Sequence, residues 1–154
     1  METADRKLLI EQLDRKIMIL SHFKESEIPT NGWIHAIRTA LNMSLTQLAK
    51  KLGKSVPTMR EIELREESRS ITLKKLMETA EALDLKLVYG FIPKDRTLEN
   101  MIEKRAAELA RKIVMNPSQT MQPGDLEAGR EGLEKAINEQ TEKIILEMPG
   151  SLWD

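Results

Sequence analysis

The sequence predicts a mainly α-helical protein, and three observations support this prediction. Apolar residues recur at steps of three and four along most of the 154-residue chain, as on one face of a helix. Aromatic residues make up only 3% of the chain, so the core must be built from Leu, Ile, Met and Ala, which favours packed helices over a sheet. Residues 85–92, LKLVYGFI, give a single candidate for a strand.

The composition excludes several kinds of site. The chain has no cysteine, which rules out disulfides and zinc–thiolate sites and favours a cytoplasmic location. No apolar run approaches the roughly 20 residues needed to cross a bilayer, so no membrane partner is expected. His22 and His35 lack a second ligand at metal spacing, so we interpret both as surface residues and expect no metal and no cofactor. No phosphate loop or nucleophile motif is present, and an enzyme is not expected.

The charge is unevenly distributed, although the net charge is only −1. Residues 31–60 contain five basic side chains and no acidic one, whereas residues 116–154 contain eight acidic and three basic side chains. A local positive patch is what attraction to phosphates requires. The acidic C-terminal stretch would be repelled by DNA and is free for another role.

Residues 43–63 are predicted to form two short helices joined by a tight turn. One face of the first helix is apolar and consists of Leu45, Leu48, Ala49 and Leu52. Ser44 can cap this helix, and Gly53 stands where a left-handed residue ends one. Ser55 can cap the second helix, and Pro57 falls in its first turn, where its missing N–H costs nothing. Two such helices form a helix-turn-helix unit, whose second helix fits a DNA major groove.

The second helix is expected to have an inward and an outward face. The inward residues are predicted to be Met59, Ile62 and Glu63. The outward residues are predicted to be Val56, Thr58, Arg60 and Glu61.

The spacing LA-x-x-LG-x-S-x-x-T, continued by apolar residues at 59 and 62 and by Glu63, resembles the Xre/Cro-type family of phage-repressor-like helix-turn-helix proteins. The resemblance covers about residues 33–88 and implies a lambda-repressor-like DNA-binding domain, which we place at residues 31–93. Leu45 stands where the family often has Gln, and Val56–Pro57 stand where it often has Gln, Arg or Ser.

An apolar pair such as Val56–Pro57 can pack on a thymine methyl at the groove floor but cannot form a bidentate bond to a base. Base reading would therefore rest on Arg60, and Lys54 would contact phosphate. The full set of expected DNA-contacting residues is Ser44, Lys54, Ser55, Val56, Pro57, Thr58, Arg60, Glu61 and Arg65. Arg65 belongs to a charged stretch, residues 65–70, that we expect to be a loop.

Further helices are predicted around this unit. The N-terminal arm, residues 1–30, contains a helix at about 4–23 whose stripe consists of Leu9, Leu13, Ile17 and Leu20. This stripe must be buried either within the chain or on a second copy. Residues 33–42 and 71–83 complete the DNA-binding domain, with Trp33 expected in the core and Thr72 as a cap.

The predicted strand at residues 85–92 has no second strand to pair with in this chain. An unpaired strand is costly, and pairing with the same strand of a second copy about a two-fold axis would satisfy it. The sequence therefore predicts a homodimer through Leu85, Leu87, Tyr89 and Phe91. Two reading helices about one helical turn apart would suit a palindromic operator.

The C-terminal part is predicted to contain a helix within residues 94–115, a linker at 116–124 and a helix at 126–147. We interpret residues 116–154 as an acidic arm that binds a partner. Its candidate contact residues are Glu131, Ile137, Ile144 and Trp153. For Trp153, packing on its own helices is an equal alternative.

The N-terminal arm, MSLTQLAKKLGKS, ITLKKLMETAEALDLKLVYGFIP and the ending LWD together resemble the mobile mystery protein A family. This resemblance implies an antitoxin that represses its own operon and restrains a neighbouring Fic-domain toxin. Glu131–Gly132 matches only the end of the inhibitory pattern [Ser/Thr]-x-x-x-Glu-[Gly/Asn] of such antitoxins. The alternatives are a stand-alone regulator and a protein-interaction module whose reading helix is degenerate.

Overall fold

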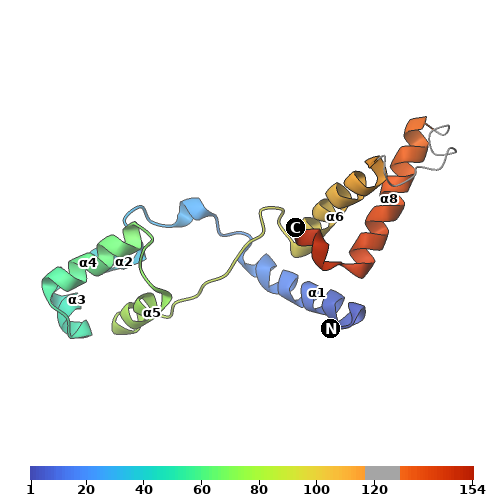
Figure 1. Ribbon diagram of the computed structural model, residues 1–154. Coiled ribbons are helices and arrows are strands. Elements are labelled where there is room, and N and C mark those ends of the chain that lie inside the picture. The colour runs from blue at the N-terminus through green and yellow to red at the C-terminus, as the bar shows by residue number, and fades with distance from the viewer. Residues whose placement is uncertain (117–128) are drawn as a thin grey trace. The chain divides into compact units, whose positions relative to one another are not determined.

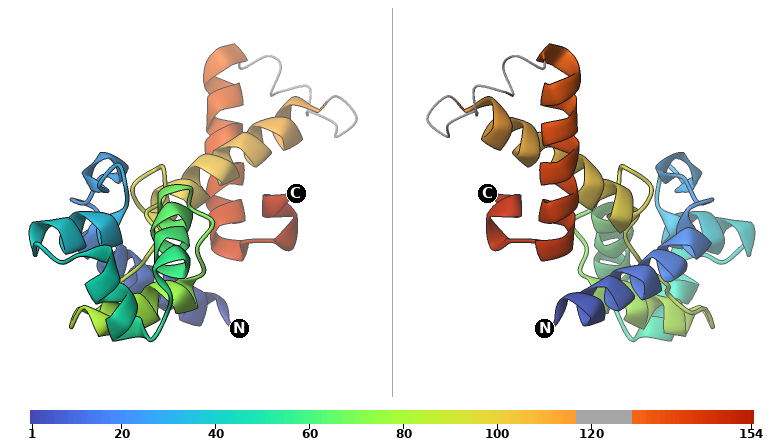
Figure 2. Two further views of the ribbon diagram at one scale, coloured as in Figure 1. Left: turned by 90° about the vertical axis from the view of Figure 1, so that its left-hand side faces the viewer. Right: turned by 90° about the vertical axis from the view of Figure 1, so that its right-hand side faces the viewer.

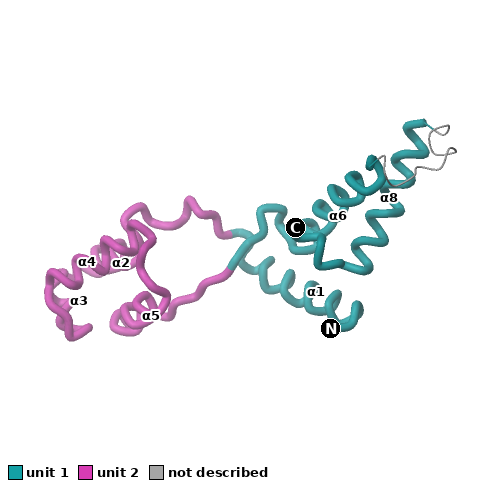
Figure 3. Tube along the Cα trace, viewed as in Figure 1, with its two compact units in different colours: residues 1–22, 91–154 teal, residues 23–90 magenta. Residues whose placement is uncertain are grey.

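The computed structural model describes residues 1–116 and 129–154 and is mainly helical there. These residues form two compact units, residues 23–90 and residues 1–22 with 91–154 (Figure 3). The elements, labelled in Figure 1 where there is room, are α1 Thr3–Leu20, η1 Glu25–Glu27, α2 Trp33–Ala40, α3 Leu45–Leu52, α4 Val56–Glu67, α5 Leu73–Ala82, α6 Leu98–Met115, α8 Gly129–Glu147 and η2 Gly150–Trp153. The predicted linker at 116–124 lies, apart from Asn116, outside the described residues.

The unit of residues 23–90 packs α2 to α5 around one apolar core. Its buried residues are Ile34, Leu48, Ala49, Met59, Ile62 and Leu83. The predicted bounds of α3 are confirmed, as is Thr72 as the cap of α5, where its hydroxyl oxygen accepts from the Lys75 N–H at 3.1 Å. The prediction of a loop from residue 65 is wrong, because α4 continues to Glu67.

The prediction that Trp33 lies in the core is wrong. Trp33 is the first residue of α2 and remains 42% exposed, because Ile34 occupies the core position beside it. The indole stacks instead on Phe23, with ring centroids 6.2 Å apart. This contact joins the connector before α2 to the helix itself.

Glu66 of α4 caps the N-terminus of α2 from a distance of more than 30 residues. Its carboxylate oxygens accept the backbone N–H groups of Trp33 at 2.9 Å and Ile34 at 2.8 Å. Gly32 precedes these groups with φ 87° and ψ 162°, a region that is essentially restricted to glycine. A Cβ on Gly32 would also lie 2.8 Å from Glu66 Oε1. The carboxylate can approach the helix end because residue 32 has no side chain.

Replacing Gly32 with alanine should lower the free energy of unfolding by about 1–3 kcal/mol, from backbone strain and displacement of the Glu66 carboxylate. Chemical denaturation with far-ultraviolet circular dichroism measures this loss. Gly53→Ala is the matched control: φ is 64° there, but nothing lies within 4 Å of an added Cβ. Equal losses for the two variants would show that the contact with Glu66 adds nothing to the strain.

Residues 85–93 form neither a helix nor a strand in the single chain. Val88, Tyr89 and Phe91 are 74%, 69% and 86% exposed, so the segment presents apolar side chains to solvent. The predicted strand needs a second chain to pair with, and the pairing remains a prediction.

The other unit packs α1, α6, α8 and η2 together, and α6 lies against α8 (Figure 2). Its buried residues are Ile102, Ala106, Ala110, Ile137, Ile144 and Leu152. The prediction that Ile137 and Ile144 contact a partner is wrong, since only 8% and 3% of their surfaces are exposed. Trp153, in contrast, is 51% exposed beside the fully buried Leu152.

Helix α1 packs within the chain, but not through the whole predicted stripe. Ile10 packs against the core, whereas Leu9 and Leu13 remain 41% and 38% exposed. Asp14 lies on the packed face because it caps α6. Its carboxylate accepts the backbone N–H groups of Leu98 at 2.7 Å and Glu99 at 3.2 Å. A carboxylate at a helix N-terminus satisfies free donors and interacts favourably with the helix dipole.

Replacing Asp14 with alanine should destabilise the unit that contains α6 by about 1 kcal/mol, as expected for the loss of a helix cap. The protection of the α6 backbone amides, measured by hydrogen exchange, reports this effect. Glu11→Ala on the exposed side of α1 is the control. If the backbone amides of Leu98 and Glu99 are equally protected from exchange in the two variants, Asp14 does not act as a cap.

Candidate nucleic-acid interface

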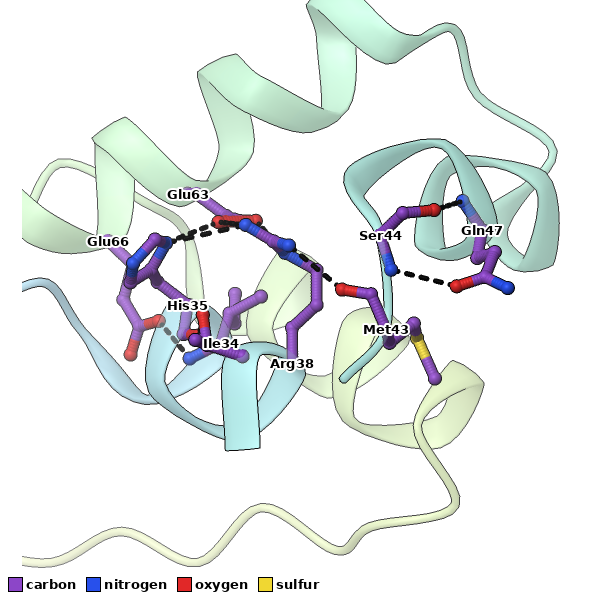
Figure 4. A network of polar contacts seen from close by, with 9 residues as sticks. Ile34, His35, Arg38, Met43, Ser44, Gln47, Glu63 and Glu66 are labelled. Carbon is purple, nitrogen blue, oxygen red and sulfur yellow. Dashed lines mark hydrogen bonds and ion pairs between the residues drawn. The ribbon is translucent and has the colours of Figure 1, made fainter. Parts of the chain in front are cut away.

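The N-terminus of α3 is closed by a reciprocal pair of hydrogen bonds (Figure 4). The Gln47 N–H donates to Ser44 Oγ at 3.1 Å, and the Ser44 N–H donates to Gln47 Oε1 at 2.8 Å. Such a capping box fixes where the helix begins. The structure therefore confirms Ser44 as the cap, and its hydroxyl can still donate to a ligand.

The turn into α4 is held at both sides. Gly53 ends α3 in the left-handed conformation, with φ 64°. Ser55 then caps α4, since its Oγ accepts from the Thr58 N–H at 3.2 Å and donates to Thr58 Oγ1 at 2.8 Å. Lys54, between them, is exposed. The turn thus presents a lysine and two linked hydroxyls at one place.

Helix α4 has a buried face and an exposed face. Met59, Ile62 and Glu63 are buried, with 0%, 5% and 7% of their surfaces exposed, as predicted. The exposed residues include Pro57, Thr58, Arg60, Glu61 and Arg65. The outward orientation predicted for Val56 is wrong, because Val56 is half-buried and packs against the core.

Glu61 and Arg65 are four residues apart on α4 and form an ion pair at 2.6 Å. Both side chains are more than half exposed, so the pair is weak and can be exchanged for another partner. Arg65 can therefore turn to a phosphate at small cost, although it faces an acid in the free protein.

A buried ion network joins α2 to α4 (Figure 4). Glu63 accepts from Arg38 Nε and Nη2, each at 2.9 Å, and Arg38 Nη1 donates to the Met43 carbonyl at 2.9 Å. His35 Nδ1 lies 3.0 Å from Glu63 Oε1. The His35 side chain remains 41% exposed, so His35 is a surface residue as predicted, but one that also contacts the buried Glu63. The network ties the first helix of the domain to the reading helix and to the loop before α3.

The network also shifts the pKa values of Glu63 and Arg38. Burial alone would raise the pKa of Glu63, but hydrogen bonds from Arg38 and His35 outweigh it and hold that pKa below the ordinary value. The hydrogen bond to Glu63 raises the pKa of Arg38. Glu63 is therefore a carboxylate at neutral pH and cancels the charge of Arg38.

The positive patch is consequently smaller than the sequence suggests. Arg38 is only 14% exposed and is paired with Glu63. The exposed basic side chains of residues 31–60 are Lys50, Lys51, Lys54 and Arg60. Lys50 and Lys51 line a shallow surface groove with Gln47 and the loop at 41–43. These lysines belong to the predicted basic stretch but are not among the contact residues predicted from the sequence.

In the parts of the chain that the structure describes, no group of His, Cys, Asp and Glu could hold a metal ion. Within the same residues, no helix has both the length and the apolar character needed to span a membrane.

Residues 34–89 match the model of a helix-turn-helix family. Neither a curated protein nor a solved structure matches the chain. The matched stretch includes all of α3, α4 and α5 and nearly all of α2. These residues therefore form an Xre-type helix-turn-helix domain, of the kind that binds DNA and regulates transcription.

Proposed function

We propose that the protein is a sequence-specific transcriptional repressor that binds a palindromic operator as a homodimer, in the cytoplasm. The exposed face of α4 carries this proposal, because Thr58 and Arg60 project from a helix whose other face is fixed in the core by Met59 and Ile62. A side chain can read a base edge only if its helix is held in one orientation.

Each part of the interface has a role in this proposal. Arg60 reads a base edge in the major groove, helped by Thr58, while Lys54 and the Ser44 hydroxyl contact phosphates. Pro57 lies at the groove floor, whereas Val56, the residue before it, packs on the core. Arg65 exchanges Glu61 for a phosphate when DNA is present.

The homodimer forms through residues 85–92. No backbone hydrogen bond involves residues 86–92 within the described part of the chain, which leaves these groups available to a second copy. Leu85, Leu87, Tyr89 and Phe91 alternate along the segment, as on one face of a strand.

A mobility-shift assay with the protein's own promoter DNA tests the proposal. We expect a complex of two protomers per site that is absent with a scrambled duplex. Its affinity should fall steeply with salt, because phosphate contacts release counterions. Equal affinity for the promoter and the scrambled duplex, at every salt concentration, would contradict sequence-specific repression.

The second part of the proposed function is that of an antitoxin that restrains a Fic-domain toxin encoded alongside. The resemblance of the arms and of the LWD ending to mobile mystery protein A supports it. Trp153, half exposed, and Glu131, exposed near the start of α8, remain candidate contact residues. Ile137 and Ile144 are excluded from that surface by their burial.

Co-purification with a Fic-domain protein encoded beside this gene tests the antitoxin role. We expect a stable complex that Trp153→Ala weakens and that Leu146→Ala, at a comparably exposed position, leaves unchanged. Specific operator binding without any complex would favour the stand-alone regulator.

A further inference from the structure

Three lysines meet at one place on the unit of residues 23–90, although they come from two separate parts of the chain. Lys54 stands in the turn between α3 and α4, whereas Lys74 and Lys75 belong to the first turn of α5. The turn lies beside α5, because α3 packs on α5, and Leu52 at the end of α3 contacts the same core as Leu76 of α5. We call these three residues the lysine cluster.

The lysine cluster surrounds a single carboxylate, that of Glu78. Lys75 Nζ lies 3.0 Å from Glu78 Oε2, and Lys74 lines the same surface groove as Glu78. The pKa of Glu78 is lowered, first by the hydrogen bond and the charge of Lys75 and then by the charges of Lys74 and Lys54. Each of the three cations is therefore close enough to act on the same carboxylate.

The cluster retains an excess of positive charge, since three ammonium groups face one carboxylate. Lys54 and Lys74 are exposed and have no ion-pair partner among the described residues. The side chains of Lys75 and Glu78 are 33% and 43% exposed, so their pair is weak and can be exchanged. Phosphate oxygens accept hydrogen bonds from ammonium groups as a carboxylate does. The cluster can therefore bind an anion in addition to Glu78.

The location of the cluster fits a phosphate of the DNA backbone. Ser55, which follows Lys54, is the cap of the reading helix α4. A reading helix of this kind contacts base edges with its N-terminal residues, and the phosphate backbones border the groove that it enters. Cations at this end of α4 are therefore placed beside a backbone when α4 lies in the groove.

We propose that Lys54, Lys74 and Lys75 together bind DNA phosphates, and that the carboxylate of Glu78 weakens this contact. The inference deepens the proposed function and rests on it only in requiring that α4 enter DNA; it needs neither the dimer nor a particular operator. Phosphate contacts carry no base information, so the cluster adds affinity for DNA of any sequence, and Glu78 restrains that affinity.

The double variant Lys54→Ala with Lys74→Ala tests the contact in the full chain. Fluorescence anisotropy with labelled promoter and scrambled duplexes, over a salt series, measures the affinities. Both should fall by about tenfold at low salt, and the slope of log affinity against log salt should become less steep by about 1–2. Lys112→Ala with Lys135→Ala, exposed on α6 and α8, gives the same net charge and should change the slope by less than about 0.5.

Glu78→Gln should act in the opposite direction. The amide still offers Lys75 an acceptor but removes the negative charge that opposes a phosphate, so both duplexes should bind about two- to fivefold more tightly. Glu81→Gln, exposed one turn further along α5, makes the same change in net charge and should alter the affinity less than about 1.5-fold. A gain in affinity cannot result from damage to the fold.

The outcomes separate this inference from the proposed function. A reduced slope for the double lysine variant and tighter binding for Glu78→Gln, each beyond its control, support the lysine cluster as a phosphate site. If both variants match their controls while the promoter is still preferred over the scrambled duplex, the phosphate site is overturned and the repressor remains. Cluster effects without any preference for the promoter support the site and contradict sequence-specific repression. Absence of binding to either duplex overturns both.

Discussion

Replacing Glu63 with glutamine should lower the free energy of unfolding by about 3 kcal/mol. This is the largest loss that we expect for a conservative substitution in the unit of residues 23–90. Glu63 is 7% exposed and accepts two hydrogen bonds from Arg38. A neutral amide leaves the Arg38 guanidinium buried without a counter-ion, and breaking one side of a buried pair typically costs about 3–5 kcal/mol. Urea denaturation at pH 7 measures the loss.

Glu61→Gln is the matched control, because Glu61 lies on the same helix and pairs with Arg65 in solvent. Its loss should remain below about 1 kcal/mol. A double replacement, Arg38→Met with Glu63→Leu, should recover part of the loss, since it removes both buried charges together. Equal losses for Glu63→Gln and Glu61→Gln would show that burial of the network is unimportant.

The same carboxylate should make the stability depend on pH in the acid range. The pKa of Glu63 is lower in the folded protein than the ordinary value of 4.5, so its contribution to stability is fully present above pH 4.5. The contribution is lost as the pH falls through the folded pKa, because the unfolded chain then binds more protons. The difference in unfolding free energy between the wild type and Glu63→Gln, measured from pH 7 to pH 3, should therefore shrink below about pH 4.5. A constant difference over this range would contradict the assignment.

Replacing Arg60 with alanine should weaken binding to the operator by about 1–3 kcal/mol and relax sequence preference at one base pair in each half-site. Arg60 is exposed on α4, between the buried Met59 and the exposed Glu61, so its replacement does not disturb the core. Competition mobility-shift assays with operators that carry each single base change measure both effects.

Arg111→Ala is the control for charge alone, because Arg111 is exposed on α6 in the other unit and the variant has the same net charge. This variant should weaken binding to the operator and to a scrambled duplex equally, and only slightly. If Arg60→Ala also weakens binding to all duplexes equally, Arg60 contacts a phosphate rather than a base.

Features governed by neighbours along the chain were predictable from the sequence. The caps Ser44, Ser55 and Thr72 lie within three residues of the N–H groups that they accept, and Gly53 ends α3 by its own backbone freedom. The same local pattern separates the buried Met59 and Ile62 from the exposed face of α4. The helix-turn-helix and most of its candidate contacts therefore follow from spacing alone.

Features governed by distant partners were not predictable in this way. Glu66 reaches Trp33 and Ile34 across 33 and 32 positions, and Glu63 meets Arg38 across 25. No periodicity marks such pairs, so Arg38 was counted as a free cation. Amphipathic stripes likewise identify a face but not what covers it.

The Asp14 cap on α6 joins positions 84 and 85 residues apart, and this has a consequence for the order of events during synthesis. A chain made from its N-terminus completes residues 23–90, a continuous stretch with its own core, before α6 exists. Until then α1 lacks α6, the helix that it packs against and caps. The whole helix-turn-helix domain is therefore synthesised before α1 can be buried. A message truncated near codon 90 would therefore yield a folded helix-turn-helix domain joined to α1, an amphipathic helix whose apolar face has lost its partner α6.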